Sequence, residues 1–360
     1  MNTNEFFKRF SSNTLAGTSN QTYFDSPEIS TGYAFYRVFK SGKFNYSLYF
    51  TNTLDGTFAD GSFTKCNYPC GNWKIHGLWA IIGKSTEEIL NGGGKSVKLT
   101  FDGQEELNVL PDAKFCTDPV ELCVSDDEYL CVKMIFSGEK IPCHYENVIL
   151  TYRADNASGE GASPNKYVPL PSMVGAEREV KSLVAFWGDS ITQGIGCPDD
   201  SYANYCAVCA KILGADYSFW NLGIGFGRGG DAATNGAWAD KVKHCQTVIV
   251  CYGVNDIFKV PSYEEIRNSL DKIVEILQGK KVIFQTIPPF DFTGDFAENY
   301  FKLNNYIKTE IAKKVYAVFD DAPLLSDPAT PAMAKFGGHP NEEGAKIWGE
   351  RLAAFLKDKL

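Results

Sequence analysis

The stretch SLVAFWGDSIT, residues 182–192, decides how the second half of this 360-residue chain folds. It begins as a continuous apolar run that ends in Gly188, which is typical of a strand buried on both faces. A helical stretch follows at about 201–213, and strand and helix signals then alternate to the end of the chain. This alternation predicts a parallel sheet with helices on both faces, whose functional side chains gather at the carboxyl ends of the strands.

Periodicity and turn residues place the remaining elements of this half. The helix expected at 262–279 has apolar residues at i, i+3 and i+4 and stops at a glycine. Further strands are expected at 216–222, 246–253, 281–289 and 315–321, and further helices at 297–314 and 341–358.

The first half of the chain has a different pattern. Short aromatic or β-branched runs are separated by Gly, Asp, Asn and Pro, which predicts an all-β sandwich or jelly roll. These runs lie at 33–39, 44–50, 73–82, 95–101, 105–110 and 129–136. Residues 153–172 are rich in Gly, Ser, Asn and Pro, and we interpret them as a long surface connection. We therefore expect a β-sandwich accessory domain at 1–172 and an α/β domain at 173–360.

Composition excludes several classes of protein. The net charge is −9, and no dense Lys/Arg cluster suggests a nucleic-acid partner. No apolar run reaches the roughly 18–20 residues that cross a bilayer, so we expect no membrane partner. The N-terminus lacks the basic start and continuous apolar stretch of a secretory signal, so the expected location is cytoplasmic.

Cysteine usage agrees with that location. The chain has 11 cysteines, an odd number, and without a signal peptide the simplest interpretation is reduced thiols. Cys206 and Cys209 form a CxxC pair, but they fall in an amphipathic helical stretch. We interpret them as small buried thiols and expect no metal site or cofactor.

Polar and glycine-rich motifs follow the predicted strands. GDSIT (188–192), NLGIGFG (221–227) and GVND (253–256) each come after a strand, and GHPN (338–341) precedes the last helix. A hydroxyl, glycine turns, an amide and a histidine would thus meet at one edge of the sheet. Acyl transfer needs a hydroxyl nucleophile, a base, and N–H donors for the oxyanion.

The histidine follows by elimination among the four that the chain has. His76 and His144 lie in the β-rich half, and His244 precedes a strand, which is the wrong end of the sheet. His339 lies in a glycine-flanked loop, where its ring could face Ser190.

GDSIT, NLGIG, GVND and HPN, in this order, resemble the four blocks of the SGNH (GDSL-type) hydrolase superfamily. The resemblance covers about residues 181–358 and implies a three-layer, flavodoxin-like hydrolase domain. The N-terminal half is similar to the β-domain of a carbohydrate-esterase-like branch, through VKLTFDGQ, LNVLPDAKFCTDPVELCV and a strand that ends in FSG.

The resemblance implies roles for individual residues. Ser190 would be the nucleophile, with its own N–H as one oxyanion donor, and His339 the base. The Asn255 amide would be a second donor. The family places a donor glycine five residues after the Asn of its second block, and this chain has Phe226 there. Gly225 and Gly227 flank it, and we expect Gly225 to supply the N–H.

The family completes a Ser–His–Asp triad with an Asp, and here this chain departs from it. The last block of the family reads D-x-x-H, and the residue three before His339 is Phe336. Either a backbone carbonyl holds the imidazole, which gives a Ser–His dyad, or another carboxylate substitutes. Asp327 is the leading candidate for that carboxylate.

The resemblance thus implies a serine esterase that hydrolyses short acyl esters, above all acetyl esters on carbohydrates, with a small-molecule or oligosaccharide ester as its substrate. Two alternatives stay open. One is a lysophospholipase or thioesterase of the same fold, and the other is a non-catalytic sugar-binding protein with a decayed site.

Overall fold

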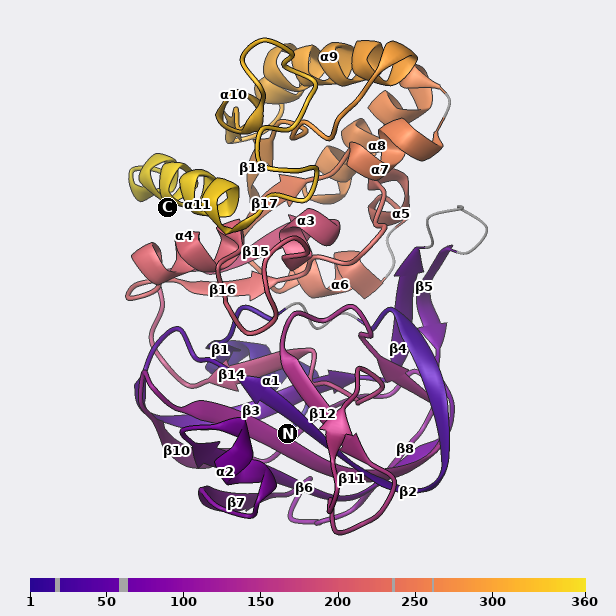
Figure 1. Cartoon of the computed structure of the whole chain (residues 1–360), viewed down its shortest axis with the longest axis vertical. Helices are drawn as coiled ribbons and strands as arrows, with labels where there is room; N and C mark the ends of the chain where they lie inside the picture. The colour runs from indigo at the N-terminus through magenta and orange to yellow at the C-terminus, as the bar shows by residue number, and fades with distance from the viewer. Residues whose placement is uncertain (17–19, 58–63, 235–236, 261) are drawn as a thin grey trace. The chain divides into compact units, whose positions relative to one another are not determined.

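Antiparallel β sheets form the N-terminal half of the chain, and a parallel sheet with helices forms the C-terminal half, as predicted (Figure 1). The computed structural model describes residues 1–16, 20–57, 64–234, 237–260 and 262–360. The described chain divides into a first unit, Met1–Asp55 with Asn67–Val180, and a second unit, Gly56–Cys66 with Lys181–Leu360.

Two antiparallel sheets make up most of the first unit. The five-stranded sheet has the order β1-β14-β3-β10, with β9 paired to β3. Its strands are β1 (Ser11–Ser12), β3 (Gly42–Thr51), β9 (Lys114–Cys116), β10 (Val120–Val124) and β14 (Met173–Ala176). The seven-stranded sheet has the order β13-β12-β2-β11-β6-β7, with β8 paired to β6. Its strands are β2 (Thr22–Tyr36), β6 (Trp73–Gly83), β7 (Lys95–Leu99), β8 (Leu107–Val109), β11 (Tyr129–Cys143), β12 (Leu150–Ala154) and β13 (Ser163–Pro164).

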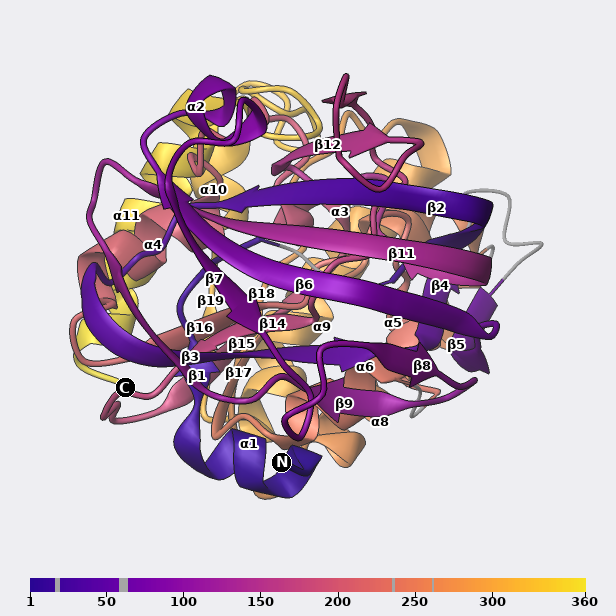
Figure 2. The same ribbon diagram turned by 90° about the horizontal axis from the view of Figure 1, so that it is seen from below.

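Long strands dominate the seven-stranded sheet. Figure 2 shows β2, β11 and β6 side by side, and β11 pairs with both of its neighbours over most of its length. Two short helices complete the unit, α1 (Thr3–Arg9) and α2 (Thr86–Leu90). A separate two-stranded sheet joins β4 (Thr53–Thr57) and β5 (Thr64–Pro69).

The boundary between the units lies later than the predicted one at 172/173. The reason is β14, whose four residues are all buried and which pairs with β3 on one side and β1 on the other. Hydrogen bonding to both neighbours ties this strand to the first unit, so the division falls after Val180.

Five parallel strands form the sheet of the second unit, in the order β16-β15-β17-β18-β19. They are β15 (Leu183–Gly188), β16 (Ser218–Asn221), β17 (Thr247–Cys251), β18 (Lys281–Gln285) and β19 (Ala317–Phe319). Numbered along the chain, the order is 2-1-3-4-5, the flavodoxin-like arrangement. Every residue of β15 and β17 is buried, as the continuous apolar runs predict.

Helices cover both faces of this sheet. Figure 1 shows α4 and α11 together on one side and α8 and α9 on the other. The stacked rings of Tyr205 and Trp348, 4.0 Å apart, join α4 to α11. The helical segments are α3 (Ser190–Gln193), α4 (Tyr205–Leu213), α5 (Gly229–Ala232), α6 (Ala237–Lys243), α7 (Val254–Lys259), α8 (Tyr263–Ile276), α9 (Gly294–Thr309), the 3-10 turn η1 (Ile311–Lys313), α10 (Ala322–Leu325) and α11 (Glu342–Lys357).

Within the described ranges, no helix combines the length and apolar character that a bilayer crossing needs. In the same part of the chain, no three His, Cys, Asp or Glu side chains are grouped as metal ligands. Cys206 and Cys209 are fully buried on α4, where the Cys206 thiol donates to the Thr192 carbonyl at 3.4 Å.

Candidate active site

The strand order of the second unit fixes where a site belongs. The connection from β15 leads to β16 on one side and the connection from β17 leads to β18 on the other, so the crevice between β15 and β17 is the switch point of the sheet. Ser190 begins the helix that follows β15, and Asn255 lies in the helix that follows β17. The two side chains therefore lie on either side of the position where parallel sheets place their ligands.

Ser190 and His339 form the central contact of the site. Ser190 Oγ lies 2.9 Å from His339 Nε2, a hydrogen bond between residues 149 positions apart in the sequence. Both side chains are only partly buried, so a substrate can reach them. A serine hydroxyl bonded to an imidazole nitrogen is the arrangement in which the imidazole can take the hydroxyl proton during nucleophilic attack.

Two neighbours fix the place of His339. Gly196 has φ of +104°, and a Cβ there would lie 2.9 Å from His339 Cβ, so only glycine allows the loops to approach this closely. The Phe290 ring meets the imidazole edge to face, with centroids 5.1 Å apart. Burial lowers the pKa of His339 below its usual value, which keeps the imidazole neutral and able to accept a proton at neutral pH.

In the described ranges of the chain, no carboxylate forms a hydrogen bond with His339. The Asp327 carboxylate accepts hydrogen bonds from the N–H groups of Ala329 and Thr330, at 2.7 and 3.1 Å, and so closes its own turn. Phe336, at the position of the family's Asp, packs against α11, where a Cβ on Gly344 would lie 2.7 Å from Phe336 Cβ. Among the described residues, Ser190 is the one hydrogen-bond partner of the His339 ring.

Asn255 is held between two acceptors. Its Nδ2 donates to the Gly227 carbonyl at 3.0 Å and to Asp189 Oδ2 at 3.3 Å. Asp189 is the N-cap of α3, and its other oxygen accepts from the Ile191 N–H at 3.0 Å. The residue before the serine therefore orients the amide that the sequence pattern assigns to the oxyanion.

The Asp189 carboxyl is completely buried, and that burial raises its pKa to about 7. The charge of Asp256 adds to the shift, while hydrogen bonds from the backbone oppose it. The Asp256 carboxyl, also buried, has a pKa raised to about 6, and it accepts from the N–H groups of Gly229 and Gly230. Asp256 thus accepts from the first two N–H groups of α5 and caps that helix.

The glycine-rich segment after β16 forms a turn with a phenylalanine in a conformation that suits glycine. Gly227 N–H donates to the Ile224 carbonyl at 3.1 Å, which closes a β-turn over residues 224–227. Phe226, the third residue of this turn, has φ of +60°, the left-handed region that usually requires glycine. Because Gly227 N–H is used in the turn, the Phe226 N–H becomes a candidate oxyanion donor beside that of Gly225.

Asn221 is a structural residue of the site to which the sequence pattern gave no role. It is fully buried, its Nδ2 donates to the Thr192 carbonyl at 2.8 Å, and its Oδ1 accepts from the Gly223 N–H at 2.8 Å. These bonds tie the turn after β16 to the serine-bearing α3. Its place at the start of NLGIG is the signal that could have identified it, whereas nothing in the sequence marks Phe290.

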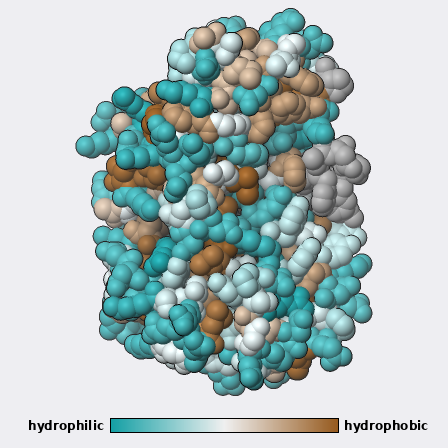
Figure 3. Space-filling model, viewed as in Figure 1, coloured by the Kyte–Doolittle hydropathy of each residue, from teal (hydrophilic) through white to brown (hydrophobic). Residues whose placement is uncertain are grey.

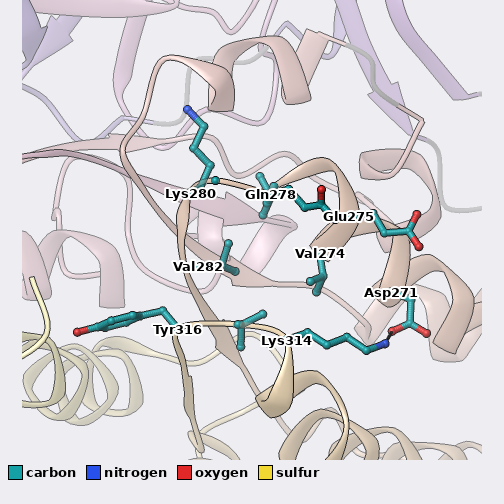
Figure 4. A pocket seen from close by; sticks show the side chains of 11 residues that line it. Asp271, Val274, Glu275, Gln278, Lys280, Val282, Lys314 and Tyr316 are labelled. Atoms are coloured by element: carbon teal, nitrogen blue, oxygen red, sulfur yellow. Dashed lines mark hydrogen bonds and ion pairs between the residues drawn. The ribbon is translucent and has the colours of Figure 1, made fainter.

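Another cavity of the second unit lies at the opposite edge of the sheet. Figure 4 shows it beside the amino ends of β18 and β19, with the Asp271–Lys314 ion pair and Tyr316 in its wall. Its volume is about 420 Å³. Ligands of parallel sheets bind at the carboxyl ends of the strands, so this cavity is not the candidate active site.

Aromatic side chains gather on the His339 side of the site. Phe290, which touches His339, also meets Phe258 with ring centroids 5.8 Å apart, and Phe258 in turn meets Phe292 and Phe296. The side chains of Phe258 and Phe296 are 37% and 41% exposed. Figure 3 shows apolar residues collected over the part of the second unit that holds α7 and α9.

Comparison with known proteins gives one family match and several similar folds. Residues 186–347 match the GDSL-like Lipase/Acylhydrolase family. No curated protein sequence matches the chain.

Three solved structures illustrate the similarity. A member of the lipolytic protein G-D-S-L family from Veillonella parvula is 17% identical over 49% of this chain and 99% of its own, with a TM-score of 0.41. A carbohydrate acetylesterase family member from Sinorhizobium meliloti is 13% identical over 49% and 97%, with a TM-score of 0.38. A family two carbohydrate esterase from Clostridium thermocellum, an active-site mutant in complex with cellohexaose, is 14% identical over 94% and 93%, with a TM-score of 0.39.

The matched segment contains all four motifs, and its strand order places Ser190 and Asn255 on either side of the switch point. His339, in the fourth motif, lies within hydrogen-bond distance of the serine. The candidate site therefore lies within the segment, residues 186–347, that matches the GDSL-like Lipase/Acylhydrolase family.

Proposed function

We propose that this protein is a serine esterase that hydrolyses short acyl esters, acetyl esters of carbohydrates above all, through a Ser190–His339 dyad. The observation that carries the proposal is the 2.9 Å hydrogen bond between Ser190 Oγ and His339 Nε2. The lowered pKa of His339 supports it, because a neutral imidazole is the form that accepts a proton.

In the first half of the reaction, Ser190 Oγ attacks the ester carbonyl carbon while His339 Nε2 takes the hydroxyl proton. The carbonyl oxygen becomes an oxyanion that accepts hydrogen bonds from the Ser190 N–H, a turn N–H at 225–226 and the Asn255 amide. Each such donor lowers the barrier by about 3 kcal/mol in well-studied enzymes. The Asn255 amide has two N–H groups, and while the bond to Asp189 holds it in place, the bond to the Gly227 carbonyl is the one that the oxyanion would replace.

The tetrahedral intermediate collapses when its bond to the alcohol oxygen breaks, and the leaving alcohol takes the proton from His339. In the second half, a water molecule gives a proton to His339 and attacks the acyl carbon. Collapse of this second intermediate releases the carboxylic acid and returns the proton to Ser190 Oγ. His339 thus serves as base and then as acid in each half, while Ser190 is the nucleophile of the first half and the leaving group of the second.

Burial keeps the resting imidazole of His339 neutral, which is the form that takes the serine proton, so the dyad can begin the reaction without a carboxylate. A dyad stabilises the imidazolium less than a triad does, so it suits esters, whose alcohol leaving groups depart more easily than amines. The carbohydrate substrate is proposed from the resemblance of both halves of the chain to a carbohydrate-esterase-like branch.

The decisive experiment measures p-nitrophenyl acetate hydrolysis by the full chain and by Ser190→Ala. We expect Ser190→Ala to lose at least a thousandfold in kcat/KM. Ser182→Ala is the matched control, because Ser182 lies at the opposite end of the same strand region and is bonded to Thr247. Equal activity in Ser190→Ala and the control would end the proposal, and a parent chain without activity would leave the non-catalytic alternative.

One observation favours a second candidate, a lysophospholipase or thioesterase. The exposed rings of Phe258 and Phe296 belong to the aromatic group that reaches His339, and apolar surface beside a catalytic histidine suits a longer acyl or aryl group. A series of p-nitrophenyl esters from acetate to decanoate separates the two. Activity that rises with chain length would favour this candidate, whereas acetate release from acetylated xylooligosaccharides would support the proposed one.

A further inference from the structure

A row of alternating aromatic and lysine side chains crosses one face of the seven-stranded sheet in the first unit. Lys133 on β11 lies directly opposite Trp79 on β6 and Tyr33 on β2. The row continues from Trp79 to Lys98 on β7 and from Tyr33 to Tyr152 on β12. Directly opposed residues share a face of the sheet, so all five side chains lie on the same side.

This face carries a hydrophobic cluster of its own. Tyr33, Phe35, Ile81 and Cys131 are buried there together with Ile89 of α2, and Trp79 and Tyr152 pack against them. Two segments cover this face of the sheet beside the cluster. One is the end of α2 with residues 91–93, and the other is the loop at 158–160.

A cavity of about 450 Å³ opens between these two segments. Trp79, Ile81, Tyr33 and Lys133 contribute to its lining from the sheet, and Asn91, Ser158 and Glu160 contribute polar groups from the two segments. The volume falls within the range of small-molecule sites.

Glycines allow the cavity to have this form. A Cβ on Gly159, where φ is +79°, would lie 2.1 Å from the Tyr33 hydroxyl, so only glycine lets the 158–160 loop lie on that ring. A Cβ on Gly77 would lie 2.4 Å from the Trp79 indole, and glycine there lets the indole lie against β6.

Lys133 is the unusual member of the lining. Its Nζ lies 5.4 Å from the Tyr33 ring centroid and 5.7 Å from that of Trp79. In the described part of the chain, no carboxylate pairs with this ammonium, whereas Lys98, at the other side of Trp79, pairs with Glu105. Burial lowers the pKa of Lys133, which reflects a cation that has given up part of its water without gaining an anion.

The polar groups decide which ligand fits. An apolar ligand would cover the Lys133 ammonium without supplying a partner, and this desolvation is costly. A simple anion would suit Lys133 but would meet the Glu160 carboxylate at the rim. Sugar hydroxyls both donate and accept, so they can serve an ammonium, a carboxylate, an amide and the serine hydroxyls together. The apolar C–H face of a sugar ring suits an indole.

We propose that this cavity is a binding site for a neutral saccharide. It is formed by Trp79, Lys133 and Tyr33 of the row, by α2 and by the 158–160 loop. The site belongs to the first unit alone and involves none of the residues that the esterase proposal uses. It gives the β-rich unit a role of its own, namely retention of the protein on a polysaccharide or an oligosaccharide.

The test is isothermal titration of the full chain carrying Ser190→Ala, with cellohexaose and xylohexaose as neutral probes and trigalacturonic acid as an acidic probe. We expect at least one neutral probe to bind, and Trp79→Ala and Lys133→Met each to weaken it at least tenfold. Lys98→Met is the matched control, because Lys98 contacts the same indole but does not line the cavity. It should bind as the parent does.

Thermal melting shows whether each variant is folded. If Trp79→Ala destabilises the unit, Trp79→Phe serves in its place, and because it keeps an aromatic ring it should retain binding better than Trp79→Ala. Absence of binding by both neutral probes would overturn the proposal, and so would neutral probes that bind equally to the parent, Trp79→Ala and Lys133→Met. Binding of the acidic probe alone would overturn its assignment to neutral sugars. Because binding is measured without hydrolysis, failure here leaves the esterase proposal intact, and the reverse also holds.

Discussion

The Asp189 carboxylate accepts hydrogen bonds from two parts of the site at once, the Ile191 N–H at 3.0 Å and the Asn255 amide at 3.3 Å. Asp189 directly precedes the serine, and Asn255 follows the neighbouring strand. A single buried carboxyl therefore couples the helix that begins with Ser190 to the side chain that we assign to the oxyanion.

Replacing Asp189 by Asn should lower kcat for p-nitrophenyl acetate about tenfold with little change in KM. Both oxygens of Asp189 accept hydrogen bonds, and an asparagine offers only one acceptor, so one of the two donors loses its partner. If that donor is Asn255, its amide is no longer held for the oxyanion, and one misplaced donor costs rate rather than binding.

The control for this variant is Asp231→Asn, which alters the ion pair with Arg228 on α5 and leaves the contacts of Asn255 alone. A melting curve close to that of the parent shows that Asp189→Asn is folded. Unchanged kcat in a folded Asp189→Asn protein would contradict the positioning role.

The rate of hydrolysis should rise with pH to a plateau, with its midpoint below the ordinary histidine pKa of about 6.5. Burial lowers the pKa of His339, so the imidazole loses its proton, and becomes an active base, at a lower pH than a solvated histidine would. Activity is therefore present above this pKa and lost as the pH falls through it. Measurement of kcat/KM for p-nitrophenyl acetate between pH 4 and 8 tests this.

Phe290→Ala provides the comparison for that profile. Phe290 covers one side of the imidazole, and its removal admits water, which should move the midpoint upward toward 6.5. Phe319→Ala removes a buried ring elsewhere in the second unit and should leave the midpoint in place. A midpoint above 6.5 in the parent enzyme would contradict the effect of burial.

The fold of the second unit could be predicted because its strands are continuous apolar runs between punctuated helices. Those patterns gave β15 and β17 and hence the edge at which the motifs meet. The four motifs then identified Ser190 and His339, which lie 149 positions apart and which the structure places in hydrogen-bond contact. Local sequence patterns were enough to identify these two residues because Ser190 follows the end of β15 and His339 lies just before α11.

Other features depend on contacts that no local pattern encodes. Phe290 and Gly196 touch His339 from loops distant in sequence, and only the folded chain brings them together. The boundary at Val180 depends on the long-range pairing of β14 with β3, which a composition change near 172 does not reveal. The positive φ of Phe226 could not be predicted either, because a left-handed turn residue is usually glycine and a phenylalanine does not indicate one.

Asp327→Asn should reduce kcat on an acetyl ester by less than tenfold. The carboxylate of Asp327 accepts from the N–H groups of Ala329 and Thr330, and these bonds lower its pKa, so its charge serves its own turn. Loss of a triad aspartate costs about 10⁴ in kcat where an enzyme depends on it. A thousandfold loss in Asp327→Asn with an unchanged melting temperature would therefore replace the dyad with a triad.

The last prediction compares two substitutions of Phe226. Phe226→Gly should keep kcat for p-nitrophenyl acetate within about threefold of the parent, and Phe226→Val should lower it at least tenfold. Phe226 has φ of +60° at the third position of the 224–227 turn. Glycine adopts this conformation without strain, whereas a residue with a side chain pays about 1–2 kcal/mol of conformational free energy. A β-branched side chain tolerates this region least, so valine should force the turn to rearrange.

The pair separates the backbone from the side chain. Both variants remove the aromatic ring, so a loss shared by glycine and valine would assign the function to the ring and contradict the role of the turn. A loss confined to valine would show that the conformation of the backbone is what matters. Since the N–H of residue 226 stays in both variants, that result would mean that catalysis depends on where the left-handed turn directs its N–H groups. An intact turn in Phe226→Gly should then preserve the oxyanion donor, whichever residue occupies position 226.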